Sequence, residues 1–179
     1  EWDRLYILDD AASTSAKLPR SLKSFEVDGI MYRTQSATGR IVDVIWKDPI
    51  KFGGYEGDID IPATVEFEGV TYTVRGIGPG AFYKCPKLGH VSLATGVRSI
   101  GVGAFEASGI KSIELPTDLN TISYRAFADC SQLKDVICHK LTPLSSIGTD
   151  AFSESTLQKC KLWVPETSVS KYTNSISWK

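Results

Sequence analysis

The sequence lacks the features of several common protein classes. None of its 179 residues lies in an apolar run that approaches the roughly 18 residues of a membrane-spanning helix, so we expect a soluble chain. Basic residues are not in excess, because 20 Lys and Arg face 21 Asp and Glu. The resulting net charge of −1 argues against binding to nucleic acid or to an anionic membrane. The sequence starts at Glu1 without a Met or a charged-then-apolar leader, which fits a processed product that has lost its targeting segment.

Groups that commonly carry catalysis are also scarce. The sequence has only two histidines and four cysteines, with no CxxC or Cys/His spacing typical of a metal site. Cys138 and His139 are adjacent, but neighbours in a strand point to opposite faces and cannot easily share a proton. The glycines of the stretch 76–80 do not have GxGxxG spacing and are better explained as turn formers. We therefore predict no enzyme, no metal and no cofactor.

What the sequence does contain is a repeat. The dipeptide Ala-Phe occurs four times, at spacings of 23, 22 and 25 residues, which is a period typical of stacked repeat proteins. An apolar hook precedes each copy, as in Val74 and Ile77, and a short strand-like run follows it. The strand-like runs are expected at 88–93, 110–115, 133–138 and 157–162.

A single repeat of this length cannot bury its own apolar face, whereas stacked repeats turn each repeated position into a buried column. Phe is the natural residue to fill the middle of each coil. Within each strand, apolar positions two apart point to one face and the residues between them point to the other. The pattern therefore predicts one buried face and one displayed face.

The motif Ile-Gly-x-x-Ala-Phe-x-x-Cys-x-x-Leu-x-x-Val-x-Leu, found over residues 58–165, resembles the BspA-like branch of the leucine-rich repeats. The resemblance implies a leucine-rich repeat solenoid, a strand-rich α/β superhelix with short helical turns. It also implies a secreted or surface protein of the kind frequent in anaerobic host-associated bacteria, where members adhere to host matrix proteins or to other cells.

The ends of the chain differ from the repeats. We interpret residues 1–24 as a leader or linker, and residues 25–76 as an N-terminal β-hairpin cap that includes a degenerate first repeat at 58–62. About four coils span 77–165. The remaining residues, 166–179, are a C-terminal cap with a short helix through 168–172, whose Tyr172 and Trp178 cover the last coil.

Two disulfides could be expected in an exported chain with four cysteines, but the repeat register argues otherwise. Cys85 and Cys130 occupy the same position two coils apart, so their Cα atoms should be ~10 Å from one another. Cys138 and Cys160 should lie ~8 Å apart on a diagonal between neighbouring strands, which is also too far for a bridge. We predict four free, mostly buried thiols.

The displayed positions provide the candidate partner-binding face. The sequence spacing predicts three columns along it, and Ile137 and Trp163 are apolar where solvent is expected, as interface anchors are. Alternatively, Trp163 packs under the C-terminal helix. The face comprises His90, Ser92, Ser112, Glu114, Asp135, Ile137, His139, Lys159, Lys161 and Trp163, with His90, Ser112, Asp135 and Lys159 in the first column.

Taken together, these patterns favour a non-catalytic binding module displayed outside the cell. Its expected partner is a host matrix or cell-surface protein, and neither nucleic acid nor membrane insertion is expected. The alternative is an architectural spacer within a longer surface protein, because repeats of this type carry many unrelated binding surfaces.

Overall fold

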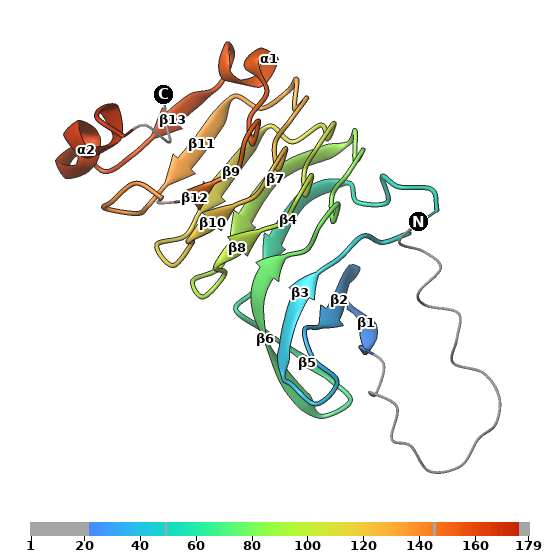
Figure 1. The fold of residues 1–179 in the computed structure, drawn as a ribbon. Helices are drawn as coiled ribbons and strands as arrows, with labels where there is room; N and C mark the ends of the chain where they lie inside the picture. The colour runs from blue at the N-terminus through green and yellow to red at the C-terminus, as the bar shows by residue number, and fades with distance from the viewer. Residues whose placement is uncertain (1–21, 49, 145, 176–179) are drawn as a thin grey trace.

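The computed structural model describes residues 22–48, 50–144 and 146–175, and it shows a strand-rich fold with few helices. In Figure 1 the strands follow one another from the N-terminal to the C-terminal end as layers of a stack. One sheet consists of five parallel strands. In spatial order they are β4 (Gly57–Ile61), β7 (Leu88–Leu93), β9 (Ser112–Leu115), β11 (Asp135–Cys138) and β13 (Lys161–Trp163).

The second sheet joins the apolar hooks to the N-terminal hairpins. Its parallel part places two-residue strands beside the end of β6 (Val70–Ile77). On the other side of β6, β3 (Ile41–Val44) also pairs in parallel, so the N-terminal strands extend the same sheet. The remaining members are β1 (Ser24–Val27), β2 (Ile30–Thr34), β5 (Thr64–Phe67), β8 (Ser99–Ile100), β10 (Thr121–Ile122) and β12 (Ser146–Ile147).

The hairpin expected at Asp28-Gly29 is present. It joins the antiparallel strands β1 and β2, and both turn residues have positive φ angles, 50° and 79°. Two-residue hairpins prefer this left-handed turn because its twist matches that of the strands. Glu68 and Gly69 form the same kind of turn between β5 and β6, with φ angles of 51° and 72°.

A continuous stack of phenylalanine rings fills the space between the two sheets. Phe82, Phe105 and Phe127 are fully buried, and Phe152 is partly buried at the C-terminal end. Successive ring centroids lie 4.9, 5.0 and 4.9 Å apart, and the rings are tilted by no more than 10°. This spacing equals the distance between neighbouring strands, so each repeat adds one strand and one ring to the stack. Tyr55 closes the N-terminal end, with its ring 4.8 Å from that of Phe82.

The repeats approach one another closely at the glycine that follows three of the four hook isoleucines, at positions 78, 101 and 148. A Cβ added to Gly101 would lie 2.7 to 2.9 Å from three backbone atoms of residues 77–79 in the preceding repeat. Gly148 is more crowded still, because its added Cβ would lie 2.3 Å from the backbone nitrogen of Tyr124. Glycine at these positions lets the backbones of adjacent repeats hydrogen-bond directly, as Gly101 does to the carbonyl of Ile77 at 2.8 Å.

The last repeat corrects the predicted strand at 157–162. A helical turn, α1 (Glu154–Leu157), occupies the start of that segment, and the strand begins only at Lys161. Lys161 therefore pairs with Asp135, and Trp163 pairs with Ile137. The expected column containing Lys159 was wrong by two residues, because the turn of α1 consumes residues that run as a loop in the earlier repeats.

A short helical segment follows β13 near the predicted position. A 3-10 turn (Glu166–Ser168) leads into α2 (Val169–Thr173). Tyr172 is buried, and its hydroxyl donates to the carbonyl of Lys140 at 3.0 Å and contacts that of Thr142 at 3.2 Å. This residue covers the end of the core as expected, whereas Trp178 lies outside the described residues.

The phenylalanine stack generates a stability prediction. Phe105→Ala should lower the free energy of unfolding by ~3–5 kcal/mol, because Phe105 has a ring on either side and the cavity cannot collapse. Phe152→Ala, at the partly exposed end of the stack, should cost less. Urea denaturation followed by circular dichroism measures both values. A Phe105 variant as stable as the wild type would refute the stack as the main core.

The close backbone approach generates a second prediction. Gly101→Ala should destabilise the protein by ~1–3 kcal/mol, the range for inserting a methyl group into a packed site. Ser123 occupies the equivalent position in the next repeat and already has a Cβ, so Ser123→Ala is the matched control and should change stability little. Thermal denaturation distinguishes the two, and equal melting temperatures would show that the repeats can move apart without cost.

Candidate binding face

The exposed side of the five-stranded sheet forms a flat surface that we call the strand face. The burial of β9 and β11 alternates strictly, with every second residue buried in the core. The register aligns the outward positions into two rows across the strands. One row contains His90, Ser112, Asp135 and Lys161, and the other contains Asp60, Ser92, Glu114, Ile137 and Trp163.

The end of the strand face nearest the N-terminus is polar and internally bonded. Asp58 accepts a hydrogen bond from the backbone N–H of His90 at 2.7 Å, and the hydroxyl of Ser92 donates to Asp60. His90 Nδ1 lies 2.7 Å from the Ser112 hydroxyl on β9. The binding face predicted from the sequence did not include Asp58 and Asp60. The alternation Asp58-Ile59-Asp60-Ile61 was a sufficient signal that both carboxylates point outward.

The other end of the strand face has an apolar pair, of which Trp163 is exposed and Ile137 is half-buried. Ile137 and Trp163 lie directly opposite each other on β11 and β13, and 53% of the Trp163 surface is exposed. Trp163 Nε1 donates to Asp135 Oδ1 at 2.7 Å, which fixes the orientation of the indole. The alternative in which Trp163 packs under the C-terminal helix is therefore wrong, and Tyr172 covers the core instead.

The two histidines lie on the strand face at different positions. His139 follows the end of β11, with its Nε2 3.6 Å from a carboxylate oxygen of Glu114. The adjacent Cys138 points into the core, where its sulfur lies 3.2 Å from the hydroxyl of Tyr172. The structure therefore separates this Cys/His pair as strand alternation predicts. Within the residues that the structure describes, no group of three or more His, Cys, Asp or Glu side chains could hold a metal ion.

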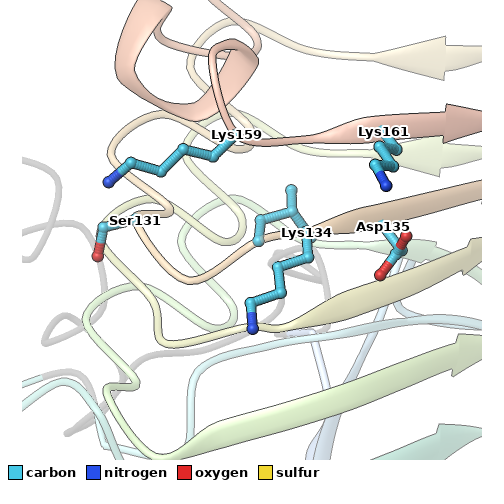
Figure 2. Close-up of a pocket in the computed structure, with 6 residues that line it drawn as sticks. Ser131, Lys134, Asp135, Lys159 and Lys161 are labelled. Atoms are coloured by element: carbon cyan, nitrogen blue, oxygen red, sulfur yellow. The ribbon is translucent and has the colours of Figure 1, made fainter.

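Lys159 does not lie in a row of the strand face but at the entrance to β13. Together with Lys134 and Lys161 it surrounds an open hollow of about 380 Å³. Figure 2 shows Lys159 on the side of Ser131, with Lys161 beside Asp135 at the other side. The remaining lining residue is Leu133. The hollow adjoins the apolar pair, because Asp135 lines the hollow and accepts the hydrogen bond from Trp163, and Lys161 lies two residues before Trp163 on β13.

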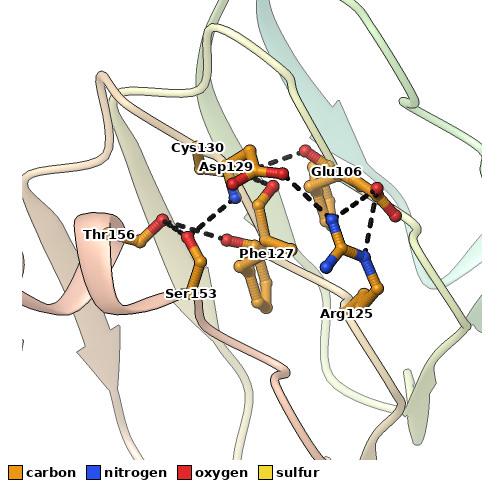
Figure 3. A network of polar contacts seen from close by, with 9 residues as sticks. Glu106, Arg125, Phe127, Asp129, Cys130, Ser153 and Thr156 are labelled. Carbon is orange, nitrogen blue, oxygen red and sulfur yellow. Dashed lines mark hydrogen bonds and ion pairs between the residues drawn. The ribbon is translucent and has the colours of Figure 1, made fainter.

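The turns on the opposite side of the repeats contain a charged network that binds one repeat to the next. Arg125 donates to Glu106 at 2.8 Å and to Asp129 at 2.9 Å (Figure 3). The hydrogen bond and the charge of Glu106 raise the pKa of the Arg125 guanidinium, which is charged at any accessible pH. Every charge in this network is satisfied locally, so the arrangement is explained by stability.

A column of small hydrogen-bonding side chains runs beside the phenylalanine stack. Cys130 Sγ lies 3.0 Å from the carbonyl oxygen of Phe105, and the hydroxyl of Thr156 donates to that of Phe127 at 3.3 Å (Figure 3). Thr156 thus pairs with a buried carbonyl of the preceding repeat, whereas Cys130 adds a second contact to the Phe105 carbonyl, which also accepts from the backbone N–H of Ser108 at 3.0 Å. Ser108 takes the equivalent position between Cys85 and Cys130, so the motif cysteine has a structural role.

All four cysteines are free thiols. Burial raises the pKa of the Cys130 thiol to about 12 and that of Cys160 to about 11, and it also raises the pKa of Cys85. The corrected register places Cys160 opposite Lys134, four residues before Cys138, so these two sulfurs lie farther apart than the diagonal estimate. Thiols with raised pKa values are poor nucleophiles at neutral pH.

Comparison with known proteins agrees with this architecture. The BspA type leucine-rich repeat region matches residues 64–177 in 6 copies. The fold resembles a leucine-rich repeat protein from Bacteroides ovatus, with a TM-score of 0.62 and 29% identity over 77% of this chain. This chain covers 33% of that protein.

Two further solved structures are similar. A leucine-rich repeat protein of T. pallidum has a TM-score of 0.58 and 25% identity, over 79% of this chain and 64% of its own. The pneumococcal vaccine antigen PcpA, at 23% identity over 82% of this chain and 39% of its own, shares the fold with a TM-score of 0.61. No curated protein sequence matches the chain significantly.

The parallel strands, the stacked rings and these matches define a leucine-rich repeat protein. The family match covers more than half of the sequence, and the chain belongs to the BspA type leucine-rich repeat family. None of the helices within the described ranges is long and apolar enough to cross a membrane.

The cysteine environment generates a prediction about thiol chemistry. Denaturation without reductant should release four thiols that react with Ellman's reagent, because no pair lies in bridging position. In the native protein at pH 8 all four should react slowly, and alkylation should accelerate above pH 10 at Cys160 first, as the pH approaches its raised pKa of about 11. Peptide mapping by mass spectrometry identifies the modified residue. Fewer than four thiols after denaturation would contradict the register.

Proposed function

We propose that this chain is part of a repeat solenoid that acts outside the cell as a non-catalytic binding module. The strand face recognises a protein partner, either a host matrix protein or a protein on another cell. The observation that carries this proposal is the apolar pair of exposed Trp163 and half-buried Ile137, with the indole of Trp163 held in place by Asp135. Tryptophan is enriched among the residues that dominate binding energy at interfaces.

The chemistry of the strand face supports binding over catalysis. Its carboxylates and imidazoles are spread over several strands, and the thiols of Cys85, Cys130 and Cys160 have raised pKa values. A preorganised, rigid sheet loses little conformational entropy when a partner docks on it, which favours recognition by the exposed side chains. Membership of a repeat family frequent in surface proteins agrees with an extracellular location.

An architectural role is the second candidate. This chain covers a third of the Bacteroides ovatus protein that it resembles, so a longer protein could use these repeats to hold another domain at a distance. In that case the apolar pair would contact a neighbouring part of the same protein, and the isolated chain would bind no matrix protein.

Binding measurements with matched variants distinguish the two roles. The wild-type chain is first screened by biolayer interferometry against a panel of purified host matrix proteins. For any binder, Ile137→Ser and Trp163→Ser should each weaken affinity by about tenfold or more, as expected for anchors at the centre of an interface. Arg98 is exposed beside β8 on the other sheet, so Arg98→Ser is the control and should bind normally.

Three outcomes are informative. Loss of affinity only in the strand-face variants would support the proposal. Equal losses in all variants, or unchanged affinity in the strand-face variants, would exclude this surface. The absence of any binder in the panel would favour the architectural role.

A further inference from the structure

The three lysines that surround the hollow share a position between the last two strands, and no carboxylate of the described residues pairs with them. Lys23, Lys47 and Lys87 each lie within ion-pair distance of a glutamate. In contrast, Lys134, Lys159 and Lys161 are exposed and have no ion pair with any carboxylate of the described residues. Three lysine side chains thus surround the hollow without a paired carboxylate (Figure 2), and their charges make the local potential positive despite the near-neutral chain.

The one carboxylate in the hollow does not cancel this charge. Asp135 is the only acidic lining residue, and its Oδ1 already accepts the hydrogen bond from Trp163 Nε1. Three lysines and one aspartate leave an excess of two positive charges around an open space. The hydroxyl of Ser131 adds a hydrogen-bond donor at the rim. This combination suits an anionic group of the size of a carboxylate.

The charge distribution along the strand face argues against a long polyanion. The strands at the N-terminal end display Asp58 and Asp60, and β9 displays Glu114. A polyanionic chain running across the sheet would meet these carboxylates after leaving the lysines, and like charges at an interface repel. A partner whose acidic groups are confined to one spot avoids this repulsion.

The neighbourhood of the hollow indicates what accompanies the acidic group. Lys161 and Trp163 are two residues apart on β13 and point to the same face, which places them ~7 Å from one another along the strand. One short segment of a partner can therefore put a carboxylate among the lysines and an apolar side chain on Ile137 and Trp163. Glutamate next to leucine in a peptide has this composition.

We propose that the hollow is a carboxylate subsite of the strand face, which binds a Glu or Asp side chain of a protein segment whose adjacent apolar residue contacts the Ile137–Trp163 pair. This inference rests on the proposed binding function, since it specifies the partner of the same face. The strand face then fixes the orientation of the partner by charge. The acidic side of the partner binds at β11 and β13, and its basic side faces Asp58 and Asp60.

A peptide titration followed by NMR tests the subsite without a natural partner. The probe is acetyl-Glu-Leu-Glu-amide, and acetyl-Gln-Leu-Gln-amide is the uncharged control. The acidic peptide should shift the backbone amides of residues 131–135 and 159–163, with a Kd of about 1 mM for so small a ligand. Raising NaCl from 20 to 300 mM should weaken binding several-fold, because exposed charge pairs are screened.

Matched variants locate the binding charge. Each exposed lysine should contribute roughly a two- to fivefold effect, so Lys159→Gln combined with Lys161→Gln should weaken the acidic peptide about tenfold. Lys23→Gln combined with Lys47→Gln changes the net charge equally at the N-terminal hairpins and should leave binding unchanged. Equal shifts with the glutamine peptide, no shifts at the hollow, or normal binding by the Lys159/Lys161 variant would each overturn the proposal.

A heparin tetrasaccharide serves as the polyanion arm. If it binds the hollow more tightly than the acidic peptide and depends on the same lysines, the subsite belongs to a sulfated glycan and the carboxylate assignment is overturned. The result also separates the two proposals. If a matrix protein binds with dependence on Trp163 but not on the lysines, the binding function is supported and the carboxylate subsite is overturned. If the acidic peptide binds at the lysines but no matrix protein binds, the subsite is supported and the proposed matrix partner is not.

Discussion

The structure depends on one constraint, which is that a single repeat of 22 to 25 residues cannot bury its own apolar side. The phenylalanine rings meet this constraint by stacking at 4.9–5.0 Å, the distance that parallel strands impose. Each ring is covered only when a neighbouring repeat is present on both sides. The ends therefore differ from the middle: Tyr55 stacks on the N-terminal ring, and at the C-terminal end Phe152 is only partly buried while Tyr172 packs beside Cys138.

Stacking at this distance also brings backbones into contact, and the chain has specific solutions for it. Glycine after the hook isoleucine removes a Cβ that would clash, as at Gly101. Thr156 donates to the buried carbonyl of Phe127, and Cys130 contacts that of Phe105, which also accepts from the backbone N–H of Ser108. The stacked ring recurs in every repeat and the glycine in three of four, with Ser123 in the remaining one, and these shared requirements produce the motif. The outward positions of the strands are free of them, so function can vary there without changing the fold.

The strand face combines these free positions into a surface that no single repeat contains. Its polar side joins β4 to β7 and β9, its apolar pair joins β11 to β13, and the lysine hollow lies between the last two repeats. A partner that covers several strands would meet acidic, apolar and basic groups in a fixed order. Such an arrangement favours specificity of orientation over strength of any single contact.

The sequence alone determined the repeat, the inward phenylalanines, the Asp28-Gly29 hairpin and the C-terminal helical turn, because each depends on local spacing or turn chemistry. It also placed Ile137 on the outer face, since strand alternation requires it. Only the tertiary structure decided the register of the last strand. The helical turn α1 moves the start of β13 to Lys161, a shift that the spacing of the repeats in the sequence does not predict. As a result Trp163 lies beside Ile137, and Lys159 lies at the hollow.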